Sequence, residues 1–208
     1  VWVLLLCVLT TRGGGYQATR IELNASFEKM IPTQQPYIAN YLEHQKQLTG
    51  LGNALRIVVA NKHGDIYDGE YLNTLQTLSD KLYLLPGVDR AYMKSLWTPA
   101  TRWVAVTEDG LDGGPVIPDD YSGTAANLEA LRRNVQRSNE LGQLVAFDQT
   151  SSIIYVPLLA ATTDGKPLDY AVLSEQLETL RSTYQNANID IHITGFAKKV
   201  GDLIAGLK

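Results

Sequence analysis

Three carboxylates close together in the sequence are the first residues whose types and spacing could do chemistry, because oxygen ligands of this kind bind Ca²⁺. Asp65, Asp68 and Glu70 lie around Gly69. A calcium-binding loop needs the pattern D-x-[DN]-x-[DN]-G with a glutamate at its twelfth position, and this segment does not contain it. Asp68 instead suits the N-cap of a following helix, with Glu70 in the first turn. We therefore predict that these residues cap a helix.

The histidines and the other acidic residues show no pattern of a metal site. His44, His63 and His192 lack metal-ligand spacing among themselves and with Cys7, the only cysteine. Acidic residues in the stretch 108–123, which is rich in glycine and proline, are typical of solvated turns. They are Asp109, Asp112, Asp119 and Asp120. We predict no metal ion and no cofactor.

The sequence contains no signature of a catalytic centre. It has no G-x-S-x-G nucleophile elbow, no P-loop and no dinucleotide-binding fingerprint. Ser151 and Ser152 have no general base near them in the sequence. A binding or conduit domain is therefore favoured over an enzyme, and a small enzyme that uses the acidic stretch is the third hypothesis.

Three aromatic side chains are the candidate substrate-binding residues. Trp97 and Trp103 bracket the start of a segment rich in turns, and Tyr92 precedes them. Core and rim packing is one interpretation. The other is the wall of an amphipathic cleft, because aromatic surfaces with few polar groups suit apolar ligands. Such a ligand would bind weakly, between the main sheet and the segment that follows.

A strand–helix–strand pattern that occurs twice must position these residues. The first unit has apolar strand patterns at 55–60 and 88–96 around a helix at 70–84. The second has strands at 152–156 and 189–194 around a helix at 168–184. Two such units predict an α+β fold, a ferredoxin-like split βαβ sandwich in which the four strands share one sheet and both helices cover one face. Pro157 lacks a backbone N–H, so either the third strand bulges or ends near 156, or the predicted topology is wrong at this strand.

The remaining segments are an insertion and two flanks. The predicted core spans 53–97 and 149–195, and the insertion at 98–148 is predicted to form an α/β flap. The elements expected in this flap are a strand at 101–107, an irregular part at 108–123, a helix at 124–138 and a short strand at 144–147. A helix is predicted from 34 to 48, and another begins at 196.

The first nine residues, VWVLLLCVL, are uninterrupted apolar, but about 20 are needed to cross a bilayer. Three alternatives remain for this segment: the end of a truncated or altered transmembrane helix at 1–15, a signal fragment, or a buried strand. The polar and glycine-rich TTRGGG at 10–15 is predicted to end the apolar pattern.

Composition excludes several classes of protein. Hydrophobic residues make up 45% of the 208 residues and charged residues 19%, which excludes intrinsic disorder. The net charge is −4 and no long run of basic residues is present, so we predict no nucleic-acid partner. A single cysteine allows no internal disulfide.

The order of several motifs resembles one family. A membrane-helix end is followed by LNASFEKMIP, a helix, LRIVVANK, LPGVDRAYMKSLWTP, VAFDQTSSIIYVPL and IDIHITGFAKK. From residue 16 to residue 208 this order is similar to the first periplasmic loop of resistance-nodulation-division (RND) permeases. The closest resemblance is to the predicted exporters related to the MMPL lipid transporters.

The resemblance implies a periplasmic porter domain of a proton-driven exporter in the bacterial inner membrane. Its implied partners are a hydrophobic or lipid-like substrate and the remaining membrane and periplasmic domains of the same transporter, with a homo-oligomer left open. The family's proton-relay carboxylates lie in later membrane helices, so no functional residue carries over to this chain. The alternative is a stand-alone extracytoplasmic binding or sensor domain anchored to the membrane.

Overall fold

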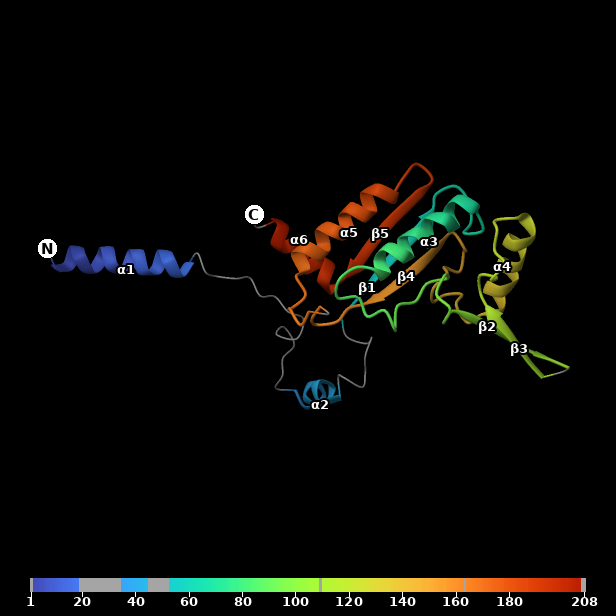
Figure 1. Ribbon diagram of the computed structural model, residues 1–208, viewed down its shortest axis with the longest axis horizontal. Coiled ribbons are helices and arrows are strands. Elements are labelled where there is room, and N and C mark those ends of the chain that lie inside the picture. The colour runs from blue at the N-terminus through green and yellow to red at the C-terminus, as the bar shows by residue number, and fades with distance from the viewer. Residues whose placement is uncertain (1, 19–34, 45–52, 109, 163, 207–208) are drawn as a thin grey trace.

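The computed structural model describes residues 2–18, 35–44, 53–108, 110–162 and 164–206. It shows a mixed α+β chain in which helices lie beside one sheet and a second, smaller sheet projects from the body (Figure 1). In chain order the elements are α1 (Trp2–Ala18), α2 (Pro36–His44), β1 (Ala54–Asn61), α3 (Gly69–Tyr83), β2 (Arg102–Thr107), β3 (Gly110–Pro115), α4 (Ala125–Arg137), β4 (Ser151–Pro157), α5 (Tyr170–Tyr184), β5 (Ile189–Gly195) and α6 (Phe196–Gly206).

Strand β1 is the centre of a three-stranded antiparallel sheet with the order β4-β1-β5. Its register pairs Ile57 with Ile154 on one side and with Ile193 on the other. Successive side chains of a strand point to opposite faces, so only every second residue of β1 meets the core. Ile57 and Val59 are accordingly buried, whereas Arg56 is exposed. These three strands confirm three of the four that the sequence predicts for this sheet.

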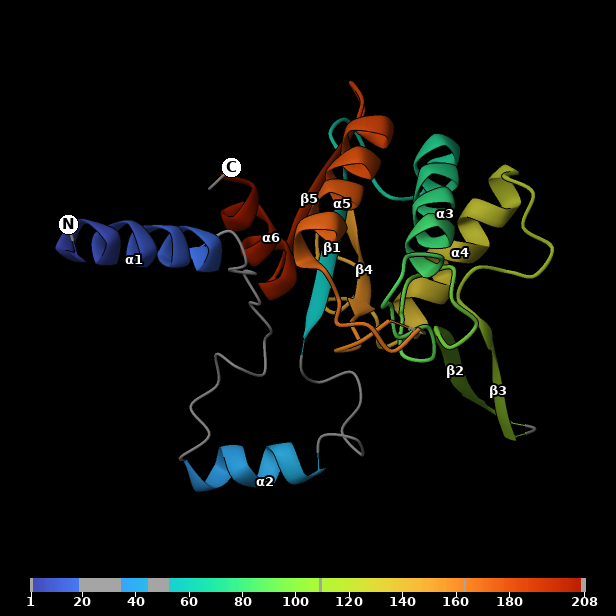
Figure 2. The same ribbon diagram turned by 60° about the vertical axis from the view of Figure 1, so that its left-hand side comes forward.

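Helices α3 and α5 lie over this sheet, and they confirm the two helices that the sequence predicts (Figure 2). Each is preceded by an aspartate that caps its first turn. Asp68 accepts a hydrogen bond from the backbone N of Tyr71 at 2.9 Å, which confirms the predicted cap, and Asp169 caps α5 in the same way. The apolar residues on the buried sides of the two helices are Tyr71, Leu72, Leu75, Leu78, Leu82, Tyr170, Leu173 and Leu177.

The predicted strand at 88–96 is wrong as a continuous strand. Only two isolated antiparallel bridges join this segment to β4 and the residue after it, Val88 with Leu158 and Lys94 with Tyr155. The chain between them turns, and the backbone N of Tyr92 donates to the carbonyl of Asp89 at 3.2 Å. A turn inside the segment interrupts the ladder, so the apolar pattern of 88–96 reports burial and not an extended backbone.

Leu144 and Val145 also pair with the outer edge of β4, beside the 88–94 segment. The backbone N of Ile153 donates to the carbonyl of Leu144 at 2.7 Å, and Val145 bridges Ser152. The strand predicted at 144–147 is therefore also reduced to bridges. Strand β4 ends at Pro157, which agrees with the predicted alternative of an end near 156, because proline cannot donate to a ladder.

The segment between the two halves forms a hairpin and a helix. The predicted strand at 101–107 is confirmed by β2, and the predicted helix is confirmed by α4, which begins after its N-cap Thr124 and ends before Ser138. The irregular structure predicted at 108–123 is wrong in part, because 110–115 forms β3. This strand exists through its pairing with β2, in which Val106 faces Leu111, and not through an apolar pattern of its own.

The predicted interruption at TTRGGG is wrong, because α1 continues to Ala18. Glycine lowers helix stability by about 1 kcal/mol relative to alanine but does not prevent a helix. The hydroxyls of Thr10 and Thr11 donate to the carbonyls of Leu6 and Cys7, so they lie within the helical turn.

The other flanking helices agree with the sequence as far as they are described. Helix α2 covers the first part of the helix predicted at 34–48, whose end lies outside the described residues. Helix α6 confirms the helix predicted from 196. In the described part of the chain no helix combines the length and the apolar character needed to cross a bilayer.

Candidate functional site

Trp97, the first of the predicted substrate-binding residues, is anchored to α3. It is partly buried and packs against the hydrophobic core. Its indole Nε1 donates to the carbonyl of Leu72 at 3.1 Å, and its ring meets Tyr121 edge-on with centroids 5.4 Å apart. A buried indole normally has such a partner, so Trp97 fixes the start of the inserted segment against α3.

Trp103 and Tyr92 make different contacts. Trp103 lies on β2 opposite Gly114, and the guanidinium carbon of Arg137 in α4 is 4.2 Å from the centroid of one of its rings. Tyr92 is 52% exposed in the turn that follows Asp89. The three predicted residues thus face α3, α4 and solvent respectively.

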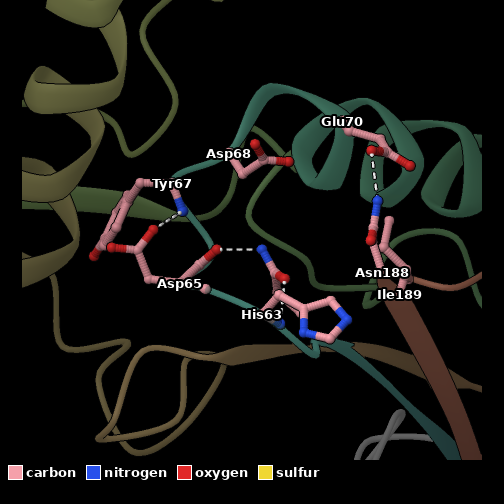
Figure 3. Close-up of a pocket in the computed structure, with 9 residues that line it drawn as sticks. His63, Asp65, Tyr67, Asp68, Glu70, Asn188 and Ile189 are labelled. Carbon is pink, nitrogen blue, oxygen red and sulfur yellow. Dashed lines mark hydrogen bonds between the residues drawn. The ribbon is translucent and has the colours of Figure 1, made fainter.

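A polar cavity of about 420 Å³ lies where β1 ends and α3 begins (Figure 3). Its walls come from the end of β1, the loop that leads to α3, and the start of β5. The lining residues are Asn61, His63, Gly64, Asp65, Tyr67, Asp68, Glu70, Asn188 and Ile189. Asp65, Asp68 and Glu70, which the sequence singles out, therefore share one cavity.

The wall nearest α4 is fixed by Asp65. One carboxylate oxygen accepts from the backbone N of Tyr67 at 3.0 Å, and the other accepts from Arg132 of α4 at 2.7 Å. The Arg132 guanidinium also lies over the Tyr67 ring, 4.1 Å from its centroid. Burial raises the pKa of Tyr67 to about 12, so its hydroxyl stays neutral and donates to Gln149 at 2.8 Å. Helix α4 thereby holds the loop that forms this wall.

The opposite wall joins α3 to β5. Figure 3 shows Glu70 of α3 facing Asn188. The two carboxylate oxygens of Glu70 accept from the amide groups of Asn186 and Asn188 at 3.2 and 3.3 Å. The two asparagines before β5, Asn186 and Asn188, are the only signal in the sequence for this wall. The sequence analysis missed them because they are far from Glu70 along the chain.

The cavity suits a small polar ligand. Its volume lies in the range of small-molecule sites, about 300 to 1,000 Å³, but its lining is rich in carboxylates and amides where most such sites are apolar. Hydrogen-bond acceptors and negative charge favour a cationic or polyhydroxylated ligand. No group of three or more histidine, cysteine or acidic side chains arranged to hold a metal ion is found among the described residues.

Ser152, considered above as a nucleophile, is a structural residue. Its side chain is buried, and its hydroxyl lies 2.6 Å from the hydroxyl of Tyr71. The Tyr71 hydroxyl also donates to the carbonyl of Val59 at 2.8 Å, and burial raises the pKa of this tyrosine. The hydroxyls of Tyr71 and Ser152 therefore link α3 to strands β1 and β4.

Comparison with models of protein families and with curated proteins gives no relative of this chain. No model of a known protein family matches the chain, and no curated protein matches its sequence.

Proposed function

We propose that this chain is the extracytoplasmic, substrate-receiving domain of a proton-driven exporter of RND type for hydrophobic or amphiphilic compounds. The proposal places it on the periplasmic side of a bacterial inner membrane, without catalytic activity of its own. The observation that carries it is the antiparallel sheet, in which β1 with its following helix α3 meets the complete unit β4–α5–β5. This arrangement agrees with the βαβ porter domain that the order of the motifs implies.

We further propose that the fold is a ferredoxin-like split βαβ sandwich with an irregular fourth strand. Strand β1 is antiparallel to β4, and the bridges of Val88 and Lys94 are antiparallel to the same part of the chain. The 88–94 segment therefore runs parallel to β1 on the far side of β4. The resulting order, β5-β1-β4 followed by 88–94, is the order of a split βαβ pair with one regular strand replaced by bridges.

Transport requires that the cargo leave again, so the contact surface should offer apolar area and few directional hydrogen bonds. Tyr92, Trp97 and Trp103 remain the proposed contact residues. Tyr92 is the most accessible of the three, whereas Trp97 has its indole N–H already bonded to α3. Tyr92 is therefore the residue at which a loss of binding is most easily separated from a loss of folding.

The polar cavity favours a second candidate, a membrane-anchored extracytoplasmic binding or sensor domain. A cavity lined by Asp65, Glu70 and Asn188 has the acceptors to hold a small cation such as a polyamine. It is linked through Asp65 and Arg132 to α4, so that a ligand there would change the contacts of the inserted segment.

One experiment separates the two functions. The ¹⁵N-labelled 208-residue chain is titrated with an apolar probe, N-phenyl-1-naphthylamine, and in parallel with spermidine and with Ca²⁺, and the shifted backbone amide signals are mapped. The exporter domain predicts that the apolar probe shifts amides near Tyr92, Trp97 and Trp103. The sensor domain predicts that spermidine shifts amides near Asp65, Glu70 and Asn188. Ca²⁺ and the apolar probe should then shift none of these amides.

Matched variants distinguish binding from packing. Tyr92→Ala should weaken binding of the apolar probe while the protein stays folded, whereas Val172→Ala, an exposed apolar residue on α5, should leave binding unchanged. If millimolar concentrations of every probe shift no amide in either region, both proposed functions are wrong.

A further inference from the structure

The hairpin β2–β3 exposes an apolar stripe on one of its faces. Val104, Val106 and Leu111 are 61%, 84% and 79% exposed. Val106 pairs with Leu111 across the hairpin, and Val104 is two residues from Val106, so the three side chains share one face. The β2–β3 hairpin that carries this stripe projects away from the main sheet, as Figures 1 and 2 show.

The opposite face of the hairpin is already occupied, so the stripe cannot turn inward. Trp103 lies on that face beneath Arg137 of α4. A side chain at Gly114, its cross-strand partner, would meet the indole, with the first added carbon 3.3 Å from Nε1. These contacts fix which face of β2 is turned to α4 and which is turned to solvent.

The outer edge of β2 has backbone groups available for pairing. The backbone N of Val116 donates to the carbonyl of Thr101, so residues at odd positions of β2 direct their backbone groups toward β3. Backbone direction alternates along a strand, and therefore Val104 and Val106 direct theirs away from β3. In the described part of the chain β2 and β3 form a sheet of two strands, with no third strand on this edge.

The outer edge of β3 is less suited to pairing. The backbone N of Gly113 donates to the side chain of its neighbour Asp112 at 2.8 Å, and Pro115 has no N–H. Proline and locally bonded groups are among the features that keep an edge strand from pairing. Of the two edges of this hairpin, β2 is the one open to another strand.

We propose that β2 pairs with β2 of a second copy of this chain, antiparallel and two-fold symmetric about Ala105. In this register Val104 lies opposite Val106 of the partner subunit, and both direct their backbone groups toward the interface. Arg102 then lies opposite Glu108 of the partner subunit, and by symmetry the same contact forms twice. Opposite charges facing each other across antiparallel strands stabilise the pair, and the two apolar stripes become neighbours.

Charge complementarity is the reason for choosing a second copy over a lipid surface. The strand carries a cation at one end, Arg102, and an anion just past the other, Glu108, which is self-complementary when two copies run antiparallel. An anionic membrane surface attracts clusters of lysine and arginine, whereas the hairpin adds a further acidic residue, Asp112. The interface is small, so we expect weak, concentration-dependent association.

The register is tested by disulfide cross-linking of the full chain in a Cys7→Ser background, which removes its only cysteine. Ala105 faces itself across the proposed axis as a non-hydrogen-bonded pair, with Cα atoms about 4.5 Å apart, within the range of disulfides. Ala105→Cys should therefore give covalent dimers under mild oxidation. Leu111→Cys, on the strand outside the interface, is the matched control and should stay largely monomeric.

Two further sets of variants, a cysteine pair and a charge reversal, keep the test independent of the folding of any one protein. Val104→Cys mixed with Val106→Cys should give mixed dimers at several times the yield of either variant alone. Arg102→Glu and Glu108→Arg should each reduce cross-linking of Ala105→Cys at least several-fold, and the two together should restore it. Equal cross-linking at 105 and 111, no mixed dimers, or no restoration by the double charge reversal would overturn the proposal. Flotation of the chain with anionic vesicles that depends on Val106 would also overturn it, in favour of a lipid surface.

Discussion

The main sheet and the β2–β3 hairpin are both antiparallel, but they differ in what covers them. In the main sheet every second residue of β1 is buried beneath α3 and α5, as Ile57 is. In the hairpin Val106, a β-branched residue that favours strands, is 84% exposed. Strand formation and burial are therefore separate properties, and only the layer packed on a strand decides which of its apolar residues enter the core.

The two regions also depend on different interactions. The main sheet gains stability from apolar side chains removed from water across several elements. A hairpin of two strands is marginal by itself, and this one is held by cross-strand pairing and by the contact of Trp103 with Arg137. Substitutions in the two regions should therefore differ in size, which the following predictions use from the largest effect to the smallest.

Leu75→Ala should cost about 2–5 kcal/mol of unfolding free energy, because a fully buried leucine is replaced and a cavity remains. Val106→Ala in the hairpin is the comparison and should change stability by less than about 0.5 kcal/mol. Urea unfolding followed by circular dichroism measures both. Similar losses in the two variants would contradict the distinction between a buried sheet and an exposed hairpin.

Lys94→Met should cost about 2 kcal/mol, because it leaves the buried carboxylate of Glu140 without its cation. The two groups lie 2.6 Å apart, and the second oxygen of Glu140 has no hydrogen-bond partner among the described residues. The double variant Lys94→Met with Glu140→Met should recover most of the loss in the same unfolding experiment. If Lys94→Met is as stable as the original chain, the ion pair between Lys94 and Glu140 does not stabilise the packing beside β4.

Gly201→Ala should cost about 1–3 kcal/mol, since a methyl group there would overlap the carbonyl oxygen of Tyr170 where α6 crosses α5. Gly206→Ala in the same helix has open space around it and should be neutral or slightly stabilising. Thermal unfolding of the two variants side by side gives the difference. Equal melting temperatures would place the close helix crossing in doubt.

Alkaline pH should weaken the contact between the insertion and the core. Burial raises the pKa of Tyr67 from 10.0 to about 12, so the unfolded chain loses this proton first as the pH rises. Stability contributed by the neutral hydroxyl is complete below pH 10, falls between pH 10 and pH 12, and is constant above that. Urea midpoints across this range should fall less steeply in Tyr67→Phe, and an identical slope would contradict the assignment.

Arg137→Ala should have the smallest effect, about 0.5–1 kcal/mol, through loss of the cation over the Trp103 ring. Its consequence should be local, with faster hydrogen exchange of the β2 amides and no change in β1. Arg133→Ala is the control on the same helix, because its ion pair with Glu129 is exposed. Equal exchange rates in the two variants would show that α4 does not hold the hairpin.

The sequence by itself determined the elements that have a local signal. Asp68 marks the start of α3, leucines at helical spacing mark its buried side, and β-branched residues mark β1. The cap of α5 at Asp169 is equally local but was not predicted. The N-cap at Thr124 belongs to the same class. These features act between residues a few positions apart, so they can be recognised without knowledge of the fold.

Only the tertiary structure decided the elements and the site that depend on distant partners. The glycine-rich segment 110–115 becomes a strand because β2 supplies its pairing, and 88–96 fails to become one because a turn interrupts it beside β4. The cavity exists because Glu70 meets Asn188 more than a hundred residues later in the chain. Pairing and cavity formation are contacts between segments far apart in sequence, and local periodicity carries no information about which segments meet.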